Sequence, residues 1–242
     1  MIVTYIFHSG YAVIFDDFSV IIDYHSDVID PEYGVFCVKD RLLNQKEDLY
    51  VVCTHSHSDH FNPEILAWKE KKPNVHYIFS KELLISQKTL PEVAYYLDKE
   101  DVYMDEHIRI EAFGSTDVGN SFLFKHNDLW FFHAGDLNNW HWSDEVSKKE
   151  ALTYENNFLC ELELLAERTD HIHVAMFPID PRLGRNYMRG AEQFIERIQT
   201  DYFLPMHFGE CYDKANAFEK CASKHGCVYL AITHPGQSFQ LY

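Results

Sequence analysis

Short apolar runs separated by turn residues dominate the first half of the chain. They are rich in β-branched and aromatic residues and are bounded by clusters such as Ser9-Gly10 and Asp16-Asp17, which is typical of short strands. This pattern predicts strands over Ile2–His8, Tyr11–Phe15, Val20–Asp23, Leu49–Cys53, His76–Phe79, Ile108–Phe113, Ser121–Lys125 and Trp130–His133. Tyr24–Asp48 is polar and irregular, and we expect one helical turn there, at Arg41–Asn44.

Helical spacing becomes prominent in the second half. Apolar residues three and four apart predict an amphipathic helix within Asp144–Glu167. Other helices are predicted from Pro63 and over Lys81–Gln87, Pro91–Asp98, Met188–Gln199 and Asp213–Lys224, with strands over His173–Phe177, Tyr202–Leu204 and Val228–Ile232. Two batches of strands, each followed by helices and with no linker between them, favour a single α+β domain over residues 1–242. The alternation alone also fits an ordinary α/β sheet.

Composition and charge narrow the class of partner. The chain is 46% hydrophobic and has a net charge of −17, which provides for a core and disfavours nucleic acid, because nucleic-acid binding depends on Lys and Arg. No stretch approaches the roughly 18 apolar residues of a membrane span. We therefore expect a small-molecule substrate, with no nucleic-acid or membrane partner. The sequence leaves the oligomeric state open.

The N-terminus and the cysteines bear on the compartment. Met1–His8 is apolar but has no basic region and no small-residue cleavage site, so it does not resemble a signal peptide. The six cysteines form no C-x-x-C pair, which favours reduced thiols. We expect a cytoplasmic protein.

The segment His55-Ser56-His57-Ser58-Asp59-His60 contains three His and one Asp within six residues. These are the side chains that bind Zn²⁺ and related ions. In an extended loop after a strand, side chains two apart face the same side, so His55 and His57 can face one metal. Capping of a helix and solvation of the loop are the alternative reading.

A catalytic metal site needs further ligands from distant parts of the chain. Asp136 follows Ala134-Gly135 at the end of a predicted strand, and His207 follows Pro205-Met206 at the end of another. Taken alone, Asp136 also fits a simple Gly-Asp turn, and His207 fits a structural histidine. Because the cluster at residues 55–60 needs further ligands, Asp136 and His207 are both candidate metal ligands.

These segments, taken in order, resemble the five motifs of the metallo-β-lactamase superfamily: Asp23 after a strand, His55–His60, Gly114–Gly119, Ala134–Asp136 and His207. The match spans nearly the whole chain. The sequence is most similar to the branch of metal-dependent hydrolases related to L-ascorbate-6-phosphate lactonase, through Phe7-His8-Ser9-Gly10 and Phe177-Pro178-Ile179-Asp180-Pro181-Arg182.

The resemblance implies a four-layer αββα sandwich with the metals at one edge. It implies that His55 and His57 bind a first metal, and that Asp59, His60 and His207 bind a second. Asp136 would bridge the two ions, and Asp23 would orient the metal loop without binding metal. The implied cofactor is one or two divalent ions, Zn, Mn or Fe.

The third motif departs from the family pattern. Ser115 stands where the family has a histidine ligand, in Gly114-Ser115-Thr116-Asp117. Either Asp117 replaces that ligand, a water fills the position, or only the second site is occupied. We expect weak or absent occupancy of the first site. His8, His133 and His141 were weighed as replacements, and a structural or supporting role is favoured for each. The eight other histidines lack a supporting pattern: His25, His76, His107, His126, His171, His173, His225 and His234.

The sequence therefore predicts a metal-dependent hydrolase of a small ester, lactone or phosphoester-type substrate. A metal-activated water would be the nucleophile, and Asp59 or Asp136 would orient it or accept its proton. One alternative is a non-catalytic metal-binding protein with a degenerate site. Another is an iron-dependent oxidoreductase, because the same fold hosts such enzymes.

Overall fold

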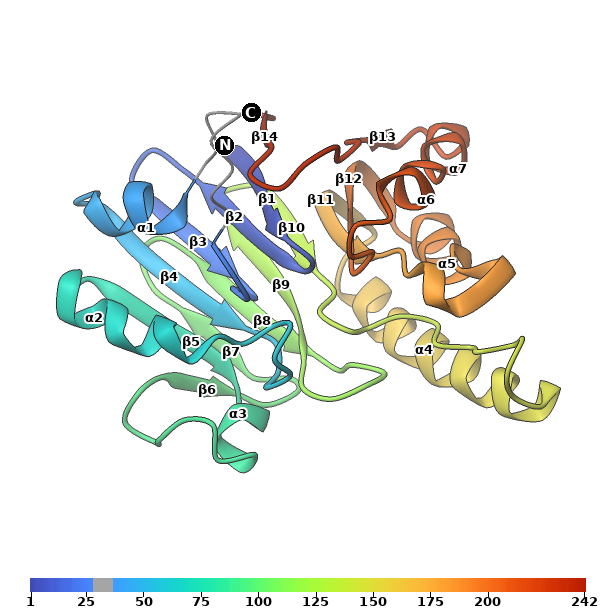
Figure 1. Ribbon diagram of the computed structural model, residues 1–242, viewed down its shortest axis with the longest axis horizontal. Helices are drawn as coiled ribbons and strands as arrows, with labels where there is room; N and C mark the ends of the chain where they lie inside the picture. Colours follow the sequence, from blue (N-terminus) through green and yellow to red (C-terminus); the bar gives the residue numbers. More distant parts are fainter. Residues whose placement is uncertain (28–36) are drawn as a thin grey trace. The chain divides into compact units, whose positions relative to one another are not determined.

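The computed structural model describes residues 1–27 and 37–242. The chain divides into two compact units, and each contains one seven-stranded sheet (Figure 1). Unit 1 comprises Met1–Asp98 and Ile232–Tyr242, and unit 2 comprises Lys99–Ala231. The predicted irregular stretch from residue 24 to residue 48 lies partly outside the described residues.

The sheet of unit 1 has the strand order β14-β1-β2-β3-β4-β5-β6. Strands β1 to β3 are antiparallel, and β3 to β6 run parallel to one another. The strands are β1 (Ile2–Phe7), β2 (Gly10–Ile14), β3 (Phe18–Ile22), β4 (Asp48–Cys53), β5 (Val75–Ser80), β6 (Tyr95–Leu97) and β14 (Ser238–Gln240). The helical segments are α1 (Val38–Arg41), η1 (Leu42–Asn44), η2 (Pro63–Ala67), α2 (Trp68–Lys71) and α3 (Glu82–Ile85).

The sheet of unit 2 has the order β13-β12-β11-β10-β9-β8-β7 and is built in the same way. Strands β7 to β10 are antiparallel, and β10 to β13 are parallel. The strands are β7 (Val102–Met104), β8 (Arg109–Phe113), β9 (Ser121–His126), β10 (Leu129–His133), β11 (His171–Pro178), β12 (Gln199–Met206) and β13 (Val228–Tyr229). The helical segments are α4 (Lys148–Arg168), η3 (Pro181–Asn186), α5 (Arg189–Arg197), α6 (Tyr212–Asn216) and α7 (Glu219–Lys224).

The parallel strands decide where the chemistry-bearing residues gather. Neighbouring parallel strands end at the same edge of a sheet, and in open α/β sheets that edge commonly binds ligands. In unit 1, Asp23 follows β3, and the 55–60 segment follows its parallel neighbour β4. In unit 2, Asp136, Asp180 and His207 follow the adjacent parallel strands β10, β11 and β12.

Most predicted elements are present, but the helix predicted over Pro91–Asp98 is wrong. Tyr95–Leu97 forms strand β6, which pairs in parallel with β5. Backbone pairing with an existing sheet edge outweighs the weak local preference of so short a segment. The helix predicted over Asp213–Lys224 is two helices, α6 and α7, and the short strands β7 and β14 were not predicted.

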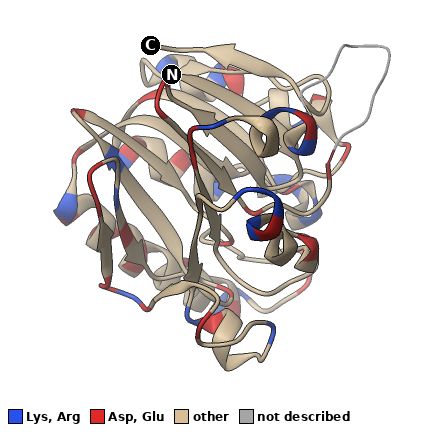
Figure 2. Cartoon of the chain, turned by 90° about the vertical axis from the view of Figure 1, so that its left-hand side faces the viewer, with Lys and Arg blue, Asp and Glu red and all other residues tan. Residues whose placement is uncertain are grey.

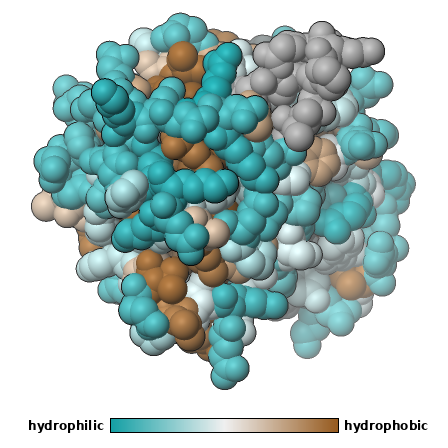
Figure 3. All heavy atoms as spheres, turned by 60° about the vertical axis from the view of Figure 1, so that its left-hand side comes forward, coloured by the Kyte–Doolittle hydropathy of each residue, from teal (hydrophilic) through white to brown (hydrophobic). Residues whose placement is uncertain are grey.

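Most apolar side chains of the strands are buried, and the charged residues lie mainly on helices and loops (Figure 2). In β3 every residue is buried. The face drawn in Figure 3 is largely hydrophilic, with apolar atoms in small patches. The two sheets and their helices confirm the predicted α+β fold class. Within the described ranges, no helix combines the length and the apolar character that crossing a membrane requires.

Glu111 on β8 anchors the C-terminal end of α4. Its carboxylate accepts hydrogen bonds from Arg168 at 2.7 and 2.8 Å and from Arg109 at 2.7 Å. Burial by itself would raise the pKa of Glu111, but these two guanidinium groups outweigh it and lower the pKa below its ordinary value of 4.5. A carboxyl group with a lowered folded-state pKa stabilises the fold above pH 4.5 and loses that contribution as the pH falls through the folded pKa.

We therefore expect Glu111→Gln to reduce the free energy of unfolding by about 1–3 kcal/mol at pH 7. The difference from the wild type should shrink as the pH falls below 4.5, which urea unfolding at pH 7 and pH 3 would measure. The control is Glu163→Gln, which breaks the exposed pair with Arg197 and should change little. A loss for Glu111→Gln that is equal at both pH values would contradict the assignment.

Candidate metal centre

The 55–60 segment of unit 1 leaves β4 as an extended loop and then turns sharply. The backbone N–H groups of His60 and Phe61 both donate to the carbonyl of His57, at 3.0 and 2.9 Å. Glu82 of α3 accepts from the backbone N–H and the hydroxyl of Ser56, at 2.8 and 2.9 Å. The turn redirects His60, and Glu82 holds the extended part, so these contacts define the shape of the loop.

Asp23 is fully buried and fixes two of the histidines. Its carboxylate accepts from Thr54 N–H at 2.8 Å, from Thr54 Oγ1 at 2.7 Å and from His60 Nδ1 at 2.7 Å. Because the Thr54 hydroxyl donates to Asp23, its oxygen accepts from His55 Nδ1, 3.0 Å away. His55 and His60 therefore both carry a proton on Nδ1 and a lone pair on Nε2, as metal binding through Nε2 requires.

His57 is exposed, and its Nδ1 atom lies 3.1 Å from His55 Nε2. Two nitrogen ligands of one tetrahedral Zn²⁺ lie about 3.3 Å apart, given Zn–N distances of about 2.0–2.1 Å. At 3.1 Å these two nitrogen atoms are within hydrogen-bond distance, and their separation is also close to that of two ligands on one ion.

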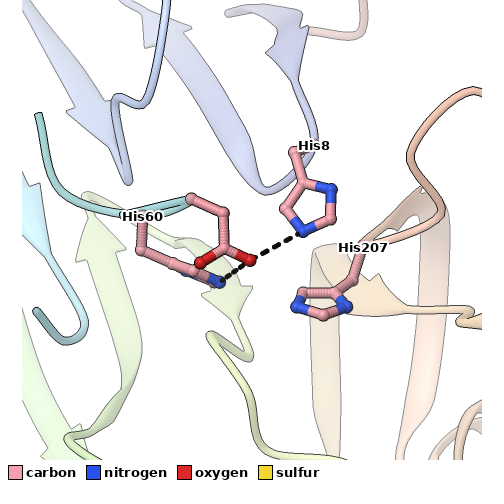
Figure 4. Close-up of side chains that lie close together, drawn as sticks. His8, His60 and His207 are labelled. Carbon is pink, nitrogen blue, oxygen red and sulfur yellow. Dashed lines mark ion pairs between the residues drawn. The ribbon is translucent and has the colours of Figure 1, made fainter. Parts of the chain in front are cut away.

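Asp59 contacts both His8 and His60, whose side chains are labelled in Figure 4. Its Oδ2 atom is 3.2 Å from His8 Nε2 and 4.0 Å from His60 Nε2. The hydrogen bond with His8 lowers the pKa of Asp59 well below its usual range, so this residue is a carboxylate at neutral pH. From the sequence, His8 was a candidate replacement for the missing histidine ligand of the first site. In unit 1 it lies instead with Asp59 and His60, the ligands implied for the second site.

In unit 2, Asp136 and His207 face each other. His207 Nε2 lies 3.4 Å from Asp136 Oδ1, again a separation typical of two ligands on one ion. Both side chains are buried, and the Trp140 ring packs edge-on against the His207 ring at 5.4 Å. The Trp140 indole also donates to the backbone carbonyl of Asp136 at 2.8 Å.

Asp180, which follows β11, holds the other side of the His207 ring. Its Oδ2 atom lies 2.9 Å from His207 Nδ1. Burial alone would raise the pKa of Asp180, but hydrogen bonds from His207 and Arg182 outweigh it and lower the pKa from 3.8 to about 2. An ionised carboxylate only accepts hydrogen bonds, so His207 carries its proton on Nδ1 and a lone pair on Nε2.

The third motif contributes structure around Asp136. The Thr116 hydroxyl donates to the carbonyl of Asn138 at 2.6 Å and accepts from the Asn138 N–H at 2.9 Å. Ser115 Oγ accepts from the backbone N–H of Asp117 at 3.3 Å. Asp117 is exposed, and among residues 1–27 and 37–242 it belongs to no group of His, Cys, Asp and Glu side chains close enough to share an ion.

Three other histidines have the opposite hydrogen-bonding pattern. The Nδ1 atoms of His133, His141 and His173 accept backbone N–H groups from Gly135, Ser143 and Trp130, at 3.0–3.1 Å. A neutral ring that accepts at Nδ1 carries its proton on Nε2 and has no lone pair there. This pattern agrees with the supporting or structural role expected of His133 and His141.

A third histidine-containing group, for which no metal site was predicted, lies in unit 2. His171, His173 and Asp201 lie close enough to hold an ion, and His171 Nε2 is 2.9 Å from Asp201 Oδ1. Because the Trp130 N–H occupies Nδ1 of His173, this ring cannot present Nε2 to a metal in its present orientation. We do not assign a metal site there.

No supporting role was predicted for Thr54 or Glu82, nor for Asp180, which lies in a segment that carries the family resemblance. Thr54 directly precedes the metal motif, and Asp180 directly follows a buried strand. These positions in the sequence could have indicated a role beside the site. Their partners lie on other elements, and the distance along the chain hid the contacts.

No protein-family model and no curated protein matches the chain. Several solved structures share its fold. Igni18, described as a novel metallo hydrolase from Ignicoccus hospitalis KIN4/I, matches at a TM-score of 0.69 and 18% identity over 100% of this chain and 99% of that chain. The metallo-β-lactamase fold protein YhfI from Bacillus subtilis matches at 0.66 and 12% identity over 99% of both chains.

CmlA, a diiron β-hydroxylase from Streptomyces venezuelae, matches at a TM-score of 0.66 and 12% identity. This comparison covers 99% of the present chain and 54% of CmlA. At these identities the comparisons establish the fold, and the chain has the metallo-β-lactamase fold.

Proposed function

We propose that the protein is a metal-dependent hydrolase with the metal ligands that the family resemblance implies. His55, His57 and Asp136 would hold the first ion, and Asp59, His60 and His207 the second, with Asp136 shared. The observation that carries the proposal is the orientation of His55, His60 and His207, each with Nδ1 hydrogen-bonded and a lone pair on Nε2. The fold shared with a metallo hydrolase supports it.

The donor set fits a divalent transition ion, because imidazole nitrogens and carboxylate oxygens suit Zn²⁺, Mn²⁺ and Fe²⁺. When bound, such an ion lowers the pKa of a coordinated water toward about 7 and polarises a carbonyl or phosphoryl oxygen. Asp59 is ionised and partly exposed, so it is suited to orient the metal-bound water through its second oxygen. Asp136 is buried and is suited to hold the metal.

We further propose that the second site binds more tightly than the first. His8 adds a third imidazole beside Asp59 and His60, whereas Ser115 offers only a hydroxyl where the first site would need a histidine. One tightly bound ion is therefore expected after dialysis against metal-free buffer, measured by atomic absorption of wild-type protein and of His8→Ala. Two full equivalents in the dialysed wild type would contradict the proposal.

The substrate class we propose is a small ester, lactone or phosphoester, following the resemblance to the lactonase-related branch. The test is hydrolysis of phosphodiester, lactone and thioester substrates with Zn²⁺ or Mn²⁺. Turnover of none of them by metal-loaded protein would favour a non-catalytic binding protein.

A second candidate is an iron-dependent oxidoreductase, which the shared fold with a diiron β-hydroxylase favours. The colour and iron content of the purified protein distinguish the two. A coloured protein with two irons per chain would support this candidate over the hydrolase.

A further inference from the structure

We propose that Asp180 is a positioning residue that holds the His207 proton on Nδ1 and thereby strengthens metal binding at Nε2. The inference rests on the proposed function, because it assigns a role to a contact of a proposed ligand. Asp180 lies in the segment Phe177–Arg182, which carries part of the family resemblance, but the resemblance implies no role for it.

Asp180 is placed for this role by backbone contacts between β11 and β12. The N–H of Ile179 donates to the carbonyl of Met206 at 2.9 Å, which holds the ends of the two strands together. The Asp180 side chain is 2% exposed and that of His207 is 4% exposed. Water therefore has little access to the 2.9 Å contact between Asp180 Oδ2 and His207 Nδ1, so the carboxylate decides which nitrogen is protonated.

Arg182 stabilises the negative charge of Asp180. Its Nη2 and Nε atoms donate to Asp180 Oδ2 at 2.6 and 2.9 Å, and its backbone N–H donates to Oδ1 at 2.9 Å. Arg182 Nη2 also lies 3.3 Å from His207 Nδ1, where only the guanidinium could donate, but the shorter 2.9 Å contact of Nδ1 with the Asp180 carboxylate requires the proton on Nδ1. Arg182 and His207 thus both donate to one shared carboxylate.

The same arrangement occurs independently in unit 1. Asp23 follows β3 and accepts from Nδ1 of His60, which follows the parallel neighbour β4. Asp180 follows β11 and accepts from Nδ1 of His207, which follows the parallel neighbour β12. By contrast, Nδ1 of His133, His141 and His173 accepts a backbone N–H. Carboxylate contacts at Nδ1 therefore occur at two proposed ligands and at none of these three structural histidines.

A carboxylate at this position strengthens the metal-binding nitrogen of His207 more than a neutral amide would. A neutral ligand ring that donates to a carboxylate is more basic at its other nitrogen, and losing such a partner typically weakens metal binding about 10–100-fold. An amide in its place would weaken the donation and would also offer an N–H that favours the opposite tautomer of His207.

The test is Asp180→Asn, with Asp144→Asn as the matched control. Asp144 also pairs with an arginine of η3, Arg185, and contacts none of the proposed ligands. We expect Asp180→Asn to bind Zn²⁺ about 10–100-fold more weakly in equilibrium dialysis and Asp144→Asn to match the wild type. Equal affinity of Asp180→Asn and Asp144→Asn would overturn the inference.

A second measurement does not depend on metal or on activity. Long-range ¹H–¹⁵N NMR of the metal-free wild type should show the His207 proton on Nδ1, and Asp180→Asn should raise the Nε2-protonated fraction. A wild-type His207 protonated on Nε2 would overturn the inference even if the variant does not fold. Wild-type protein that binds no Zn²⁺ would contradict the proposed function, whereas binding left unchanged by Asp180→Asn would contradict only the role of Asp180.

Discussion

Asp59→Ala is expected to lower the rate of hydrolysis by about 10²–10⁴-fold while leaving the fold intact. Asp59 is the ionised carboxylate that contacts His8 and His60, and it is proposed both to bind the second metal and to orient the water. Its side chain is 44% exposed, so its removal leaves no buried cavity and should cost little stability. Steady-state kinetics with saturating Zn²⁺ or Mn²⁺, together with thermal unfolding, measure the two effects separately.

The matched control is Asp48→Ala. Asp48 is also a partly exposed acid of unit 1 that pairs with a histidine, His76, at 3.6 Å. It is the first residue of β4, at the strand end opposite the metal motif, so its replacement should not affect hydrolysis. Wild-type rates in Asp59→Ala, or equal losses in both variants, would remove Asp59 from the proposed mechanism.

Asp23→Ala is expected to lower the free energy of unfolding by about 3–5 kcal/mol, even in metal-free protein. The change removes the acceptor of three hydrogen bonds at a fully buried position and leaves the Thr54 N–H without its acceptor. Urea unfolding in the presence of a chelator measures the effect.

Asp23→Asn separates stability from metal binding. The amide oxygen can still accept from Thr54, so we expect a smaller loss of stability than with Ala. The amide N–H₂ group cannot accept from His60 Nδ1, so the affinity for Zn²⁺ should fall in Asp23→Asn as it does in Asp23→Ala. Wild-type Zn²⁺ affinity in Asp23→Asn would show that Asp23 does not orient His60.

The metal motif could be predicted from the sequence because its signal is local. Three His and one Asp lie within six residues, and the preceding apolar run identifies the strand that presents them. Asp23, Asp136 and His207 required the resemblance as well, since each is a single residue after a strand. Whether all of these residues bind metal stays a prediction.

The supporting contacts could not be predicted in this way. Asp180 and His207 are 27 residues apart, and only the pairing of β11 with β12 brings them within 2.9 Å. The helix predicted over Pro91–Asp98 failed for a similar reason, because a partner strand from another part of the chain decided its conformation.

The sequence by itself determined the α+β fold class, most of the strands and the side chains able to bind metal, because hydrophobic period and residue chemistry are properties of short segments. Only the tertiary structure decided which nitrogen of each histidine carries the proton. That choice depends on the group that faces Nδ1. For His60 and His207 this group is a carboxylate from another strand end, and for His55 it is the Thr54 hydroxyl, which donates to such a carboxylate. For His133, His141 and His173 it is a backbone N–H.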